Sequence, residues 1–564
     1  MDTGDGGQDG VGARADERTD GVRLSRRHVL AGLCGAAGLT MVPAMGRFLL
    51  PAATAAGVVS VTLELDQVAG QRPERSMGFS FEKNTLSTPL FSATNAPLVA
   101  LFRLLGPGVL RLGGNSVDRV TFDADGPGST AGVVAPPDLT RLAAFADAVD
   151  WQIVYGTPFL FSTAAQVRDE AVAATAALGA RIDAFELCNE PDLYVLDATA
   201  KPIAGTPALF NARWQSFADE IRTALPDAVL CGPSTCFITF AKGFTNAFAT
   251  THAGSFSLLT QHYYRGFGFG SQTIDLLLGP DPDLDAGLDA LRATATAGGT
   301  TYRLAETNSF ANGGQPGVSN TFASALWGAD LCFKAAENGA AGLNFHNSGA
   351  GLGYPAIVTV NGVVTQIRPL FYGLLLATAA GAGPMPPIQV TGAESTLRVH
   401  AVQPSSTSVR AVLINTGAEA ATIDLDVGRE VTAATVARLL GPSLAATADV
   451  TLAGATVGID GSWTPAPAEV APVTGTRVTL AVPAASALVV TVTVVAAPPV
   501  TTTTSSTTTS STTTSSTTTT PPNPTSTSTT SPTSSTTADP GSPAIAPAAA
   551  SPAQAVPVAP AFTG

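Results

Sequence analysis

Eight short apolar runs, separated by stretches with helical spacing, constrain the fold more than any other feature of this sequence. The runs end at Phe81, Leu112, Tyr155, Cys188, Cys231, Tyr263, Ala305 and Phe345. Amphipathic, Ala/Leu-rich stretches such as 139–149, 213–225 and 321–338 lie between them. This alternation predicts a (β/α)8 TIM barrel of the α/β class. A doubly wound open sheet would need a glycine-rich phosphate loop after its first strand, and residues 78–83 lack one.

Polar side chains follow the predicted strands, at the end of a barrel where active sites lie. The residues at these strand ends are Glu82, Asn84, Asn115, Asn189, Glu190, His262, Tyr263, Tyr264 and Glu306. Pro191 has no backbone N–H and a fixed φ, so the fourth strand must end near Glu190. Carboxyl groups after the fourth and seventh strands face each other across the mouth of a barrel. One can protonate a leaving oxygen while the other attacks an anomeric carbon, so we interpret Glu190 and Glu306 as a catalytic pair.

Composition excludes some partners. The chain has 564 residues and a formal net charge of −14, which disfavours nucleic acid or an anionic membrane surface as the main partner. The charge argues less strongly against a polyanionic sugar, because a single cleft can be locally basic. Five cysteines do not make a disulfide scaffold. We expect Cys231 and Cys236 to be free buried thiols, with pairing after export as the alternative.

The N-terminal region, residues 1–56, has the pattern of a twin-arginine export signal. Arg26 and Arg27 precede an apolar run that extends to about Leu50, and small residues follow at 52–55. A membrane anchor is the alternative interpretation. We therefore expect a secreted, extracellular protein without a membrane span in its mature form, and association with the cell envelope is left open.

The pattern changes again after the predicted barrel, which occupies residues 57–385. Residues 386–498 alternate apolar and polar positions between turns, which predicts an all-β sandwich. An early apolar run, 58–65, is a candidate to cross over and join it. Residues 499–564 are a Ser/Thr/Pro-rich segment that cannot bury a core, so we predict a disordered, O-glycosylated stalk.

Several motifs, in the same order along the chain, resemble those of glycoside hydrolase family 79, the β-glucuronidase and heparanase-like family of the retaining clan A. They are Phe79–Glu82, Leu110–Asn115, Glu186–Pro191, His262–Tyr264, Glu306–Ser309 and the following pair Gly313 and Gly314. The resemblance covers roughly Met77 to Thr493. It implies a (β/α)8 barrel with an accessory β-sandwich, as the periodicity predicts independently.

The resemblance also implies roles for individual residues. Glu190 resembles the acid/base and Glu306 the nucleophile of the family. The residues that would contact substrate are Glu82, Asn115, Asn189, His262, Tyr263, Gly313, Gly314 and Tyr354. Among them, Asn189 would hold the sugar 2-hydroxyl, and Tyr263 would hydrogen-bond the nucleophile. The backbone N–H groups of the two glycines, with the phenol of Tyr354, would bind the uronate carboxylate.

Two further residues carry expectations of their own. His262 is either a site residue or a core histidine, and we place it in the site. Arg111 lies inside a predicted strand, so we expect it to pair with carboxylates in the barrel interior and to keep Glu306 ionised. Gln261 is a departure, because heparanase-like members have a histidine at this position.

We therefore predict a retaining β-glycosidase that hydrolyses β-linked glucuronides by double displacement and needs no cofactor or metal. Its substrate would be a glucuronide, an oligosaccharide or a glycoconjugate. One alternative is another clan A exo-glycosidase that acts on neutral sugars. The other is a catalytically silent carbohydrate-binding surface protein. If the enzyme is retaining, its two carboxyl groups should lie about 5–5.5 Å apart.

Overall fold

The computed structural model describes residues 58–239, 242–268, 270–348, 353–393 and 395–496. The predicted export region and the predicted stalk lie outside these residues. Within the described ranges, no helix combines the length and the apolar character that crossing a bilayer requires.

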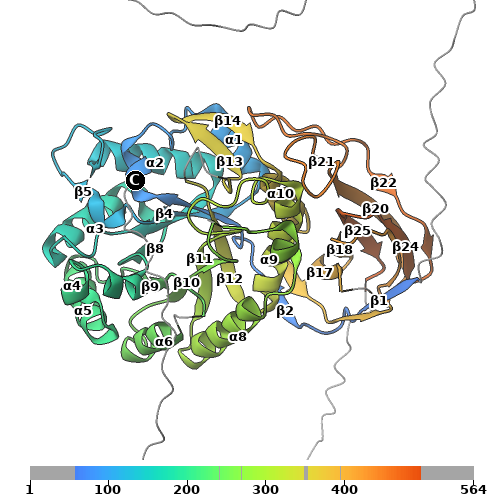
Figure 1. The fold of residues 1–564 in the computed structure, drawn as a ribbon, viewed down its shortest axis with the longest axis horizontal. Helices are drawn as coiled ribbons and strands as arrows, with labels where there is room; N and C mark the ends of the chain where they lie inside the picture. The colour runs from blue at the N-terminus through green and yellow to red at the C-terminus, as the bar shows by residue number, and fades with distance from the viewer. Residues whose placement is uncertain (1–57, 240–241, 269, 349–352, 394, 497–564) are drawn as a thin grey trace, which may run out of the picture. The chain divides into compact units, whose positions relative to one another are not determined.

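A closed barrel of eight parallel strands forms the larger part of the fold (Figure 1). Its strands, in order around the barrel, are β10 (Leu258–Tyr264), β11 (Thr301–Asn308), β12 (Ala340–His346), β3 (Gly78–Glu82), β4 (Gly108–Gly113), β7 (Trp151–Gly156), β8 (Ile182–Glu186) and β9 (Leu230–Thr235). The predicted (β/α)8 barrel is therefore confirmed.

Helices cover the outside of the barrel. They are α1 (Ala96–Leu104), α2 (Pro136–Val149), α3 (Ala164–Leu178), α4 (Lys201–Ala204), α5 (Pro207–Ala224), α6 (Lys242–Thr251), α7 (Ile274–Leu278), α8 (Pro282–Ala297), α9 (Phe322–Glu337) and α10 (Pro369–Ala379). Short 3-10 helices follow some strands: η1 (Lys83–Ser87), η2 (Val117–Arg119), η3 (Gly179–Arg181) and η4 (Pro191–Leu196). Three short strand pairs complete this part: β2 (Gly70–Arg72) with β15 (Gly383–Met385), β5 (Thr121–Phe122) with β6 (Val133–Val134), and β13 (Ile357–Val360) with β14 (Val363–Ile367).

The barrel interior is layered, because inward-facing residues recur every second position along each strand. Small apolar side chains form the lower layer: Val109, Val154, Ala184, Cys231 and Leu258. The next inward positions are polar, with Arg111 on β4, Glu186 on β8 and Thr260 on β10, all fully buried. This polar layer lies directly below the residues of the candidate site and contacts them through Arg111.

Strand irregularities re-aim the residues at the mouth of the barrel. The register shifts between Gln261 and His262 on β10, so that His262 lies opposite Glu306 instead of Ala305 on β11. An extra residue in one strand changes the face on which later side chains emerge. The sequence pattern predicted strand ends within one residue at most positions. It ended β11 at Ala305, before this irregularity, whereas the strand continues to Asn308.

The second part is a β-sandwich that lies beside α9 and α10 (Figure 1). One sheet has the order β16-β1-β19-β24-β23, and the other β17-β18-β25-β20-β21, with β22 pairing to β20. Their bounds are β1 (Val59–Leu63), β16 (Ile388–Thr391), β17 (Leu397–Ser405), β18 (Ser408–Asn415), β19 (Ala421–Asp426), β20 (Val431–Leu440), β21 (Thr451–Leu452), β22 (Glu469–Val470), β23 (Val473–Thr474), β24 (Arg477–Val482) and β25 (Ser486–Val494).

The N-terminal strand β1 lies inside this C-terminal sandwich. It pairs antiparallel with β16 and parallel with β19, and Val61 at its centre is fully buried. Its alternating burial pattern follows from apolar residues at every second position. The expectation that an early strand joins the sandwich is confirmed.

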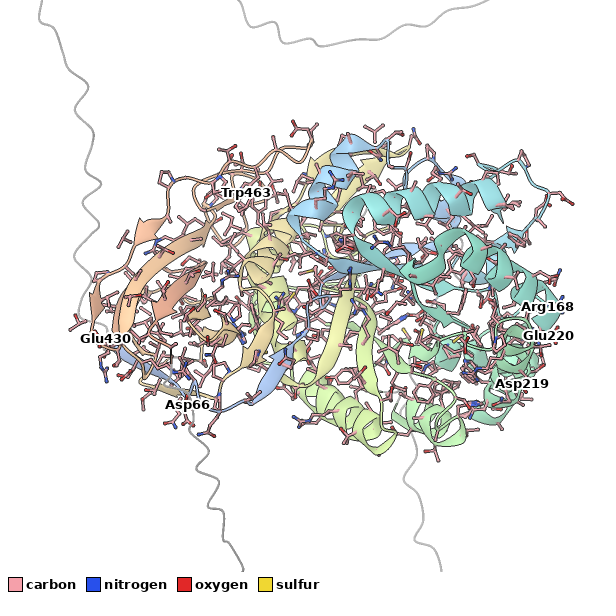
Figure 2. The ribbon with its side chains drawn as sticks, turned by 180° about the vertical axis from the view of Figure 1, so that it is seen from behind. Asp66, Arg168, Asp219, Glu220, Glu430 and Trp463 are labelled. Carbon is pink, nitrogen blue, oxygen red and sulfur yellow. The ribbon has the colours of Figure 1, made fainter. Side chains whose placement is uncertain are left out.

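Figure 2 labels surface residues of both parts of the molecule. Arg168 on α3 pairs with Glu220 on α5 at 2.5 Å, an ion pair on the outside of the barrel. On the sandwich, the indole N–H of Trp463 donates to the carbonyl oxygen of Leu452 (3.4 Å), and its ring packs against the core. Trp463 is therefore a packing residue, consistent with the lack of an aromatic binding stripe in the sandwich sequence.

Candidate active site

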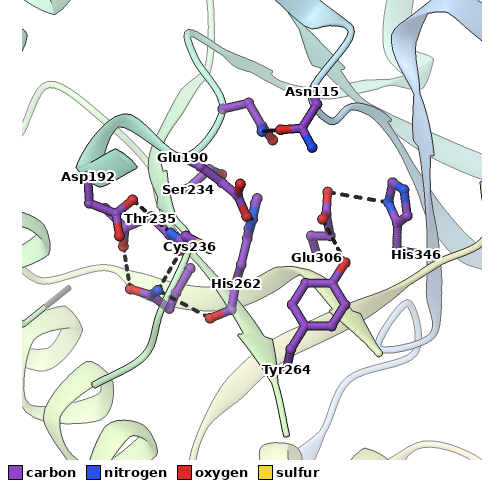
Figure 3. A network of polar contacts seen from close by, with 12 residues as sticks. Asn115, Glu190, Asp192, Ser234, Thr235, Cys236, His262, Tyr264, Glu306 and His346 are labelled. Carbon is purple, nitrogen blue, oxygen red and sulfur yellow. Dashed lines mark hydrogen bonds and ion pairs between the residues drawn. The ribbon is translucent and has the colours of Figure 1, made fainter. Parts of the chain in front are cut away.

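The two candidate catalytic carboxyl groups meet at the mouth of the barrel (Figure 3). Glu306 lies on β11, and Glu190 lies in the loop after β8, with a left-handed backbone (φ 49°). A non-glycine residue in this conformation is strained, and such strain concentrates at functional sites. Oxygen atoms of the two carboxyl groups lie within 4.8 Å of each other, and both residues are buried.

Glu306 is surrounded by donors. Its Oε2 accepts from Arg111 Nη1 (2.7 Å) and lies 3.3 Å from His346 Nδ1, while its Oε1 accepts from the hydroxyl of Tyr264 (2.7 Å). Burial alone would raise the pKa of Glu306. The positive charges of His346, His262 and Arg111 outweigh burial, so that pKa lies well below its usual range. The carboxylate is thus held ionised, as a nucleophile must be.

Arg111 organises the floor of the site. Its Nε donates to Glu186 (2.6 Å) and its Nη2 donates to Asn189 Oδ1 (2.9 Å), in addition to the bond to Glu306. Burial tends to lower the pKa of Arg111, but attraction from Glu186 and Glu306 raises it, so the guanidinium stays charged. The prediction that Arg111 pairs with carboxylates inside the barrel is confirmed.

Glu190 has a different set of neighbours. Its Oε1 lies 3.0 Å from His262 Nδ1, and its backbone N–H donates to Ser234 O (2.9 Å). His262 is fully buried, and its Nε2 has no partner in the described part of the chain. Asp192 lies two residues after Glu190. Burial and the charge of Glu190 raise the pKa of Asp192 to about 6, although the hydrogen bond from the Cys236 N–H lowers it.

Two amide side chains, those of Asn189 and Asn115, continue the hydrogen bonds of Arg111 along the mouth of the barrel. Asn189 Nδ2 donates to Asn115 Oδ1 (3.2 Å), so Arg111, Asn189 and Asn115 form one connected series. Glu82 accepts from the backbone N–H groups of Asn115 (3.2 Å) and Ser116 (2.7 Å). The contacts of Glu82 therefore fix the loop that presents Asn115.

The role expected of Tyr263 is wrong. Its hydroxyl donates to Asp281 Oδ2 (2.6 Å), the residue that caps the N-terminus of α8, and it does not reach Glu306. Alternate residues of a strand point to opposite faces, so His262 and Tyr264 face the site while Tyr263 faces the helices. Tyr264 supplies the bond to Glu306 that was expected of Tyr263.

The glycine pair and Tyr354 lie together beside this site. Gly313 and Gly314 are buried with φ of 88° and 86°, and the carbonyl oxygen of Gly313 accepts from the N–H of Tyr354 (3.1 Å). A Cβ atom on Gly314 would lie 2.7 Å from Ser319 Oγ, so this position requires glycine. Neither glycine N–H has an acceptor among the residues described. The ring of Tyr354 stacks on Tyr264 (centroids 6.3 Å apart).

Besides the weak donor Ser80 (3.5 Å), sequence reasoning missed two residues that contact Glu306, namely Tyr264 and His346. Both follow signals present in the sequence. Tyr264 stands two positions after His262 on the same strand, and His346 directly follows the predicted end of the eighth strand at Phe345. His346 thus occupies the same kind of position, the polar end of a strand, as the site residues that the sequence predicted.

Glu190, His262 and Glu306 also have the residue types of a metal site, with one potential ligand atom from each within 4.8 Å. The oxygens of Glu306, however, already accept from a guanidinium and a phenol and lie next to a histidine. Such donors compete with a cation for the same lone pairs. The arrangement suits proton transfer and nucleophilic attack better than metal binding.

Comparison with known proteins agrees with this geometry. A closed (β/α)8 barrel, two facing carboxyl groups and a C-terminal sandwich together define a glycoside hydrolase of the barrel type. Residues 399–489 match the model for the "Glycosyl hydrolase family 79 C-terminal beta domain". This match in the C-terminal part agrees with the motifs earlier in the chain, which resemble those of glycoside hydrolase family 79.

One similar protein is a beta-glucuronidase of Aspergillus niger, 26% identical over 261 residues, which are 42% of this chain and 48% of that protein. The chain thus spans about half the length of this curated relative. A 4-O-alpha-L-rhamnosyl-beta-D-glucuronidase from Fusarium oxysporum 12S has a similar structure (TM-score 0.60, 20% identity, 75% of this chain and 97% of that chain). An alpha-L-arabinofuranosidase from Thermotoga maritima shares the fold (TM-score 0.60, 12% identity, 77% and 100%).

Proposed function

We propose that this protein is a retaining β-glucuronidase, with Glu306 as the nucleophile and Glu190 as the acid/base. The observation that carries the proposal is the pairing of the two carboxyl groups, whose oxygens lie within 4.8 Å. This spacing supports a retaining mechanism, because an inverting enzyme separates its carboxyl groups by about 6.5–9.5 Å to admit a water molecule.

In the first step, ionised Glu306 attacks the anomeric carbon while Glu190 gives its proton to the glycosidic oxygen, which leaves with the aglycone. In the second step, Glu190 takes a proton from water, and that water cleaves the ester between the sugar and Glu306. Arg111 and Tyr264 position Glu306 and favour its ionised form. His262 positions the carboxyl group of Glu190 through Nδ1.

Substrate contacts follow from the same geometry. Asn189, fixed by Arg111 and joined to Asn115, would hold the sugar 2-hydroxyl. The N–H groups of Gly313 and Gly314, with the phenol of Tyr354, would receive the uronate carboxylate. Backbone N–H groups are uncharged donors that suit a carboxylate. Glycines have no side chain, so the backbone of this loop can approach the carboxylate closely. The named activity of the Aspergillus niger relative supports this choice of sugar.

Export by the twin-arginine route is part of the proposal and rests on the sequence around Arg26 and Arg27. The Ser/Thr-rich segment after residue 499 would then lie outside the cell. Fractionation of cells that produce the chain with Arg26→Lys and Arg27→Lys tests this point. Retention of the double variant in the cytoplasm, with release of the unmodified protein, is the expected result.

Turnover of aryl glycosides tests the enzyme assignment. The protein should hydrolyse aryl β-glucuronides, and Glu306→Gln should abolish turnover. Glu190→Ala should lose mainly the reactions with poor leaving groups, because these need the proton most. Equal losses for good and poor leaving groups would remove Glu190 from the acid role. Faster cleavage of an aryl β-glucoside would favour the neutral-sugar alternative, and binding without turnover would favour a silent binding protein.

Recognition of the carboxylate is best tested on the substrate. A proline at Gly314 would be incompatible with φ of 86°, so that substitution would rearrange the loop instead of removing one donor. The uronamide of the same aryl glycoside keeps the shape of the sugar and removes its charge. Loss of one charge-assisted hydrogen bond should lower kcat/KM by about one to two orders of magnitude. Equal turnover of the acid and the amide would place the carboxylate elsewhere.

A further inference from the structure

Two phenylalanines form a ring pair at the mouth of the barrel, apart from the residues assigned above. Phe237 follows β9 and Phe267 follows β10, and their ring centroids lie 5.1 Å apart with the planes inclined by 56°. Phe267 is 41% exposed and Phe237 is partly buried. A large aromatic side chain exposed to this extent loses hydrophobic stabilisation unless something covers it.

The segment that carries Phe237 is held on both sides. The N–H of Cys236 donates to Asp192 Oδ1 (2.8 Å), two residues after Glu190. Ile238, on the other side, is buried against Gly287 of α8. Phe237 is therefore anchored next to the loop of the acid/base.

The segment that carries Phe267 is held by the loop after Glu306. Ala311 donates to Gly266 O and accepts from the N–H of Gly268, both at 2.7 Å, so that Phe267 bridges to Ala311 as in a sheet. Gly268 also packs against the backbone of Gly314. The ring pair thus spans the side of the mouth between the acid/base loop and the loop after the nucleophile. Positions fixed in this way need little ordering when a ligand binds.

We propose that Phe237 and Phe267 form the binding platform for the aglycone, and that the aglycone is planar and apolar. The proposal rests on the proposed function. Glu190 protonates the bond to the leaving group, so the aglycone lies on the side of the sugar where Glu190 and His262 stand. The loops after β9 and β10 rise on this side of the barrel. Asn115 follows β4, which lies across the barrel from β10.

The chemistry around the ring pair selects an apolar group. Residues 236–239 and 264–268 contain one charged side chain, Arg265. Its guanidinium is already bound to Leu276 O (3.2 Å), Pro280 O (2.8 Å) and the carboxylate of Asp281. Gly266 and Gly268 flank Phe267 along the chain and add no polar side chain beside its partly exposed ring. A further charged or sulfated sugar would need cationic partners that these two segments do not offer.

The test compares kcat/KM for 2-naphthyl, phenyl and methyl β-glucuronides, together with a glucuronosyl disaccharide. Phenol and 2-naphthol are similarly acidic, so their glucuronides differ mainly in the apolar surface of the aglycone. The unmodified enzyme should prefer 2-naphthyl over phenyl, and Phe267→Ala and Phe237→Ala should each reduce this preference by roughly tenfold. Phe161→Ala, at an exposed phenylalanine in the loop after β7, is the matched control and should keep the preference.

Retention of the wild-type naphthyl preference in folded Phe267→Ala and Phe237→Ala would overturn the platform, and so would a wild-type preference for the disaccharide. Phe267→Trp should restore the naphthyl preference, which distinguishes stacking from a loss of loop structure. Failure of the unmodified enzyme to cleave every glucuronide would overturn the proposed function, whereas cleavage with no dependence on the aglycone would overturn the platform alone.

Discussion

Tyr263 and Tyr264 are neighbours on β10, but Tyr263 bonds to a helix cap and Tyr264 bonds to Glu306. Substitutions at the two positions therefore form a matched pair. Tyr264→Phe removes the donor to Glu306 Oε1 and keeps the ring that stacks on Tyr354. Burial and the nearby carboxylate raise the pKa of Tyr264, so it remains a donor at working pH. Loss of a hydrogen bond to a charged group should lower kcat/KM for an aryl glucuronide by about 10- to 100-fold, with little change in Tm.

Tyr263→Phe is the control for that experiment. It removes the bond to Asp281, which caps α8, so it should reduce the free energy of unfolding by about 1 kcal/mol and leave kcat/KM nearly unchanged. A large loss of activity in Tyr263→Phe, with none in Tyr264→Phe, would contradict the assignment of the two residues.

His346 should set the acid limit of activity. Its charge holds the pKa of Glu306 below the usual range, and Glu306 in turn raises the pKa of His346, although burial opposes this rise. Without the imidazolium, Glu306 would be protonated at a higher pH. His346→Gln should therefore move the acid limb of the kcat/KM profile to higher pH.

The same substitution at His252 is the control for the pH experiment. His252 is buried next to Trp214, bonds to Gln215, and has a pKa lowered by burial to about 4, so it is neutral at working pH. His252→Gln should leave the acid limb in place. An unchanged limb in His346→Gln would show that His346 does not influence the ionisation of Glu306.

At this scale, the sequence predicted which two carboxyl groups meet better than it predicted their contacts. The proximity of Glu190 and Glu306 was predictable because both follow strands of one barrel, and the carboxyl ends of those strands share one face. The resemblance gave the bond to Glu306 to Tyr263, whereas the alternation along β10 places Tyr264 on the same face as His262. The irregularity beside His262 inserts Ala305 into β11 and decides which residue of β11 lies opposite His262, without any glycine or proline to mark it in the sequence.

At the scale of elements, the close approach of α9 and α10 depends on one glycine. A Cβ atom on Gly373 of α10 would lie 2.0 Å from the carbonyl oxygen of Ala325 on α9. The carbonyl oxygen belongs to the backbone of α9, and the added Cβ would be bonded directly to the backbone of α10. Neither atom can rotate away, so the two helices would have to separate. Gly373→Ala should lower the free energy of unfolding by about 1–3 kcal/mol, measured by denaturant unfolding.

Gly243 in α6 is a matched helical glycine with open space around it. Gly243→Ala should be neutral or raise stability by up to about 1 kcal/mol, because alanine favours helix. Equal effects of the two substitutions would show that helix propensity, and not the contact between α9 and α10, governs both.

Elements were predictable where their period was regular. The stretches 139–149, 213–225 and 321–338 correspond to α2, α5 and α9, which begin up to six residues earlier or one later. The short pairs β2–β15 and β5–β6 were not predicted, because strands of two or three residues carry no measurable period. Their positions depend on contacts that form only after the barrel closes.

At the scale of the whole molecule, a histidine links the barrel to the sandwich. His400 on β17 lies 2.7 Å from Glu337 and 3.0 Å from Asp330 of α9, and its ring stacks on Phe333. Burial alone would lower the pKa of His400, but Glu337 and Asp330 raise it to about 10. The resulting stabilisation is complete below the unfolded pKa of about 6.5 and is lost as pH rises toward 10.

Thermal unfolding between pH 6 and pH 10.5 tests this link. The unmodified protein should lose stability on the order of a few kcal/mol across this range, and His400→Gln should show a smaller loss because it has no proton to release. Identical pH dependence of Tm in the two proteins would show that His400 does not couple the two parts.

The placement of β1 in the sandwich has a consequence for how the chain is made. Synthesis on a ribosome proceeds from the N-terminus, yet Ser60 finds its partner only at Thr391 and Asp424. The sheet therefore cannot close until nearly the whole chain has emerged, while the barrel strands between them can already assemble. A nascent chain arrested before β16 would carry β1 as an unpaired edge, open to any holdase or pairing partner. Completion of the sandwich thus acts as a late checkpoint, reached only by copies that extend through β25.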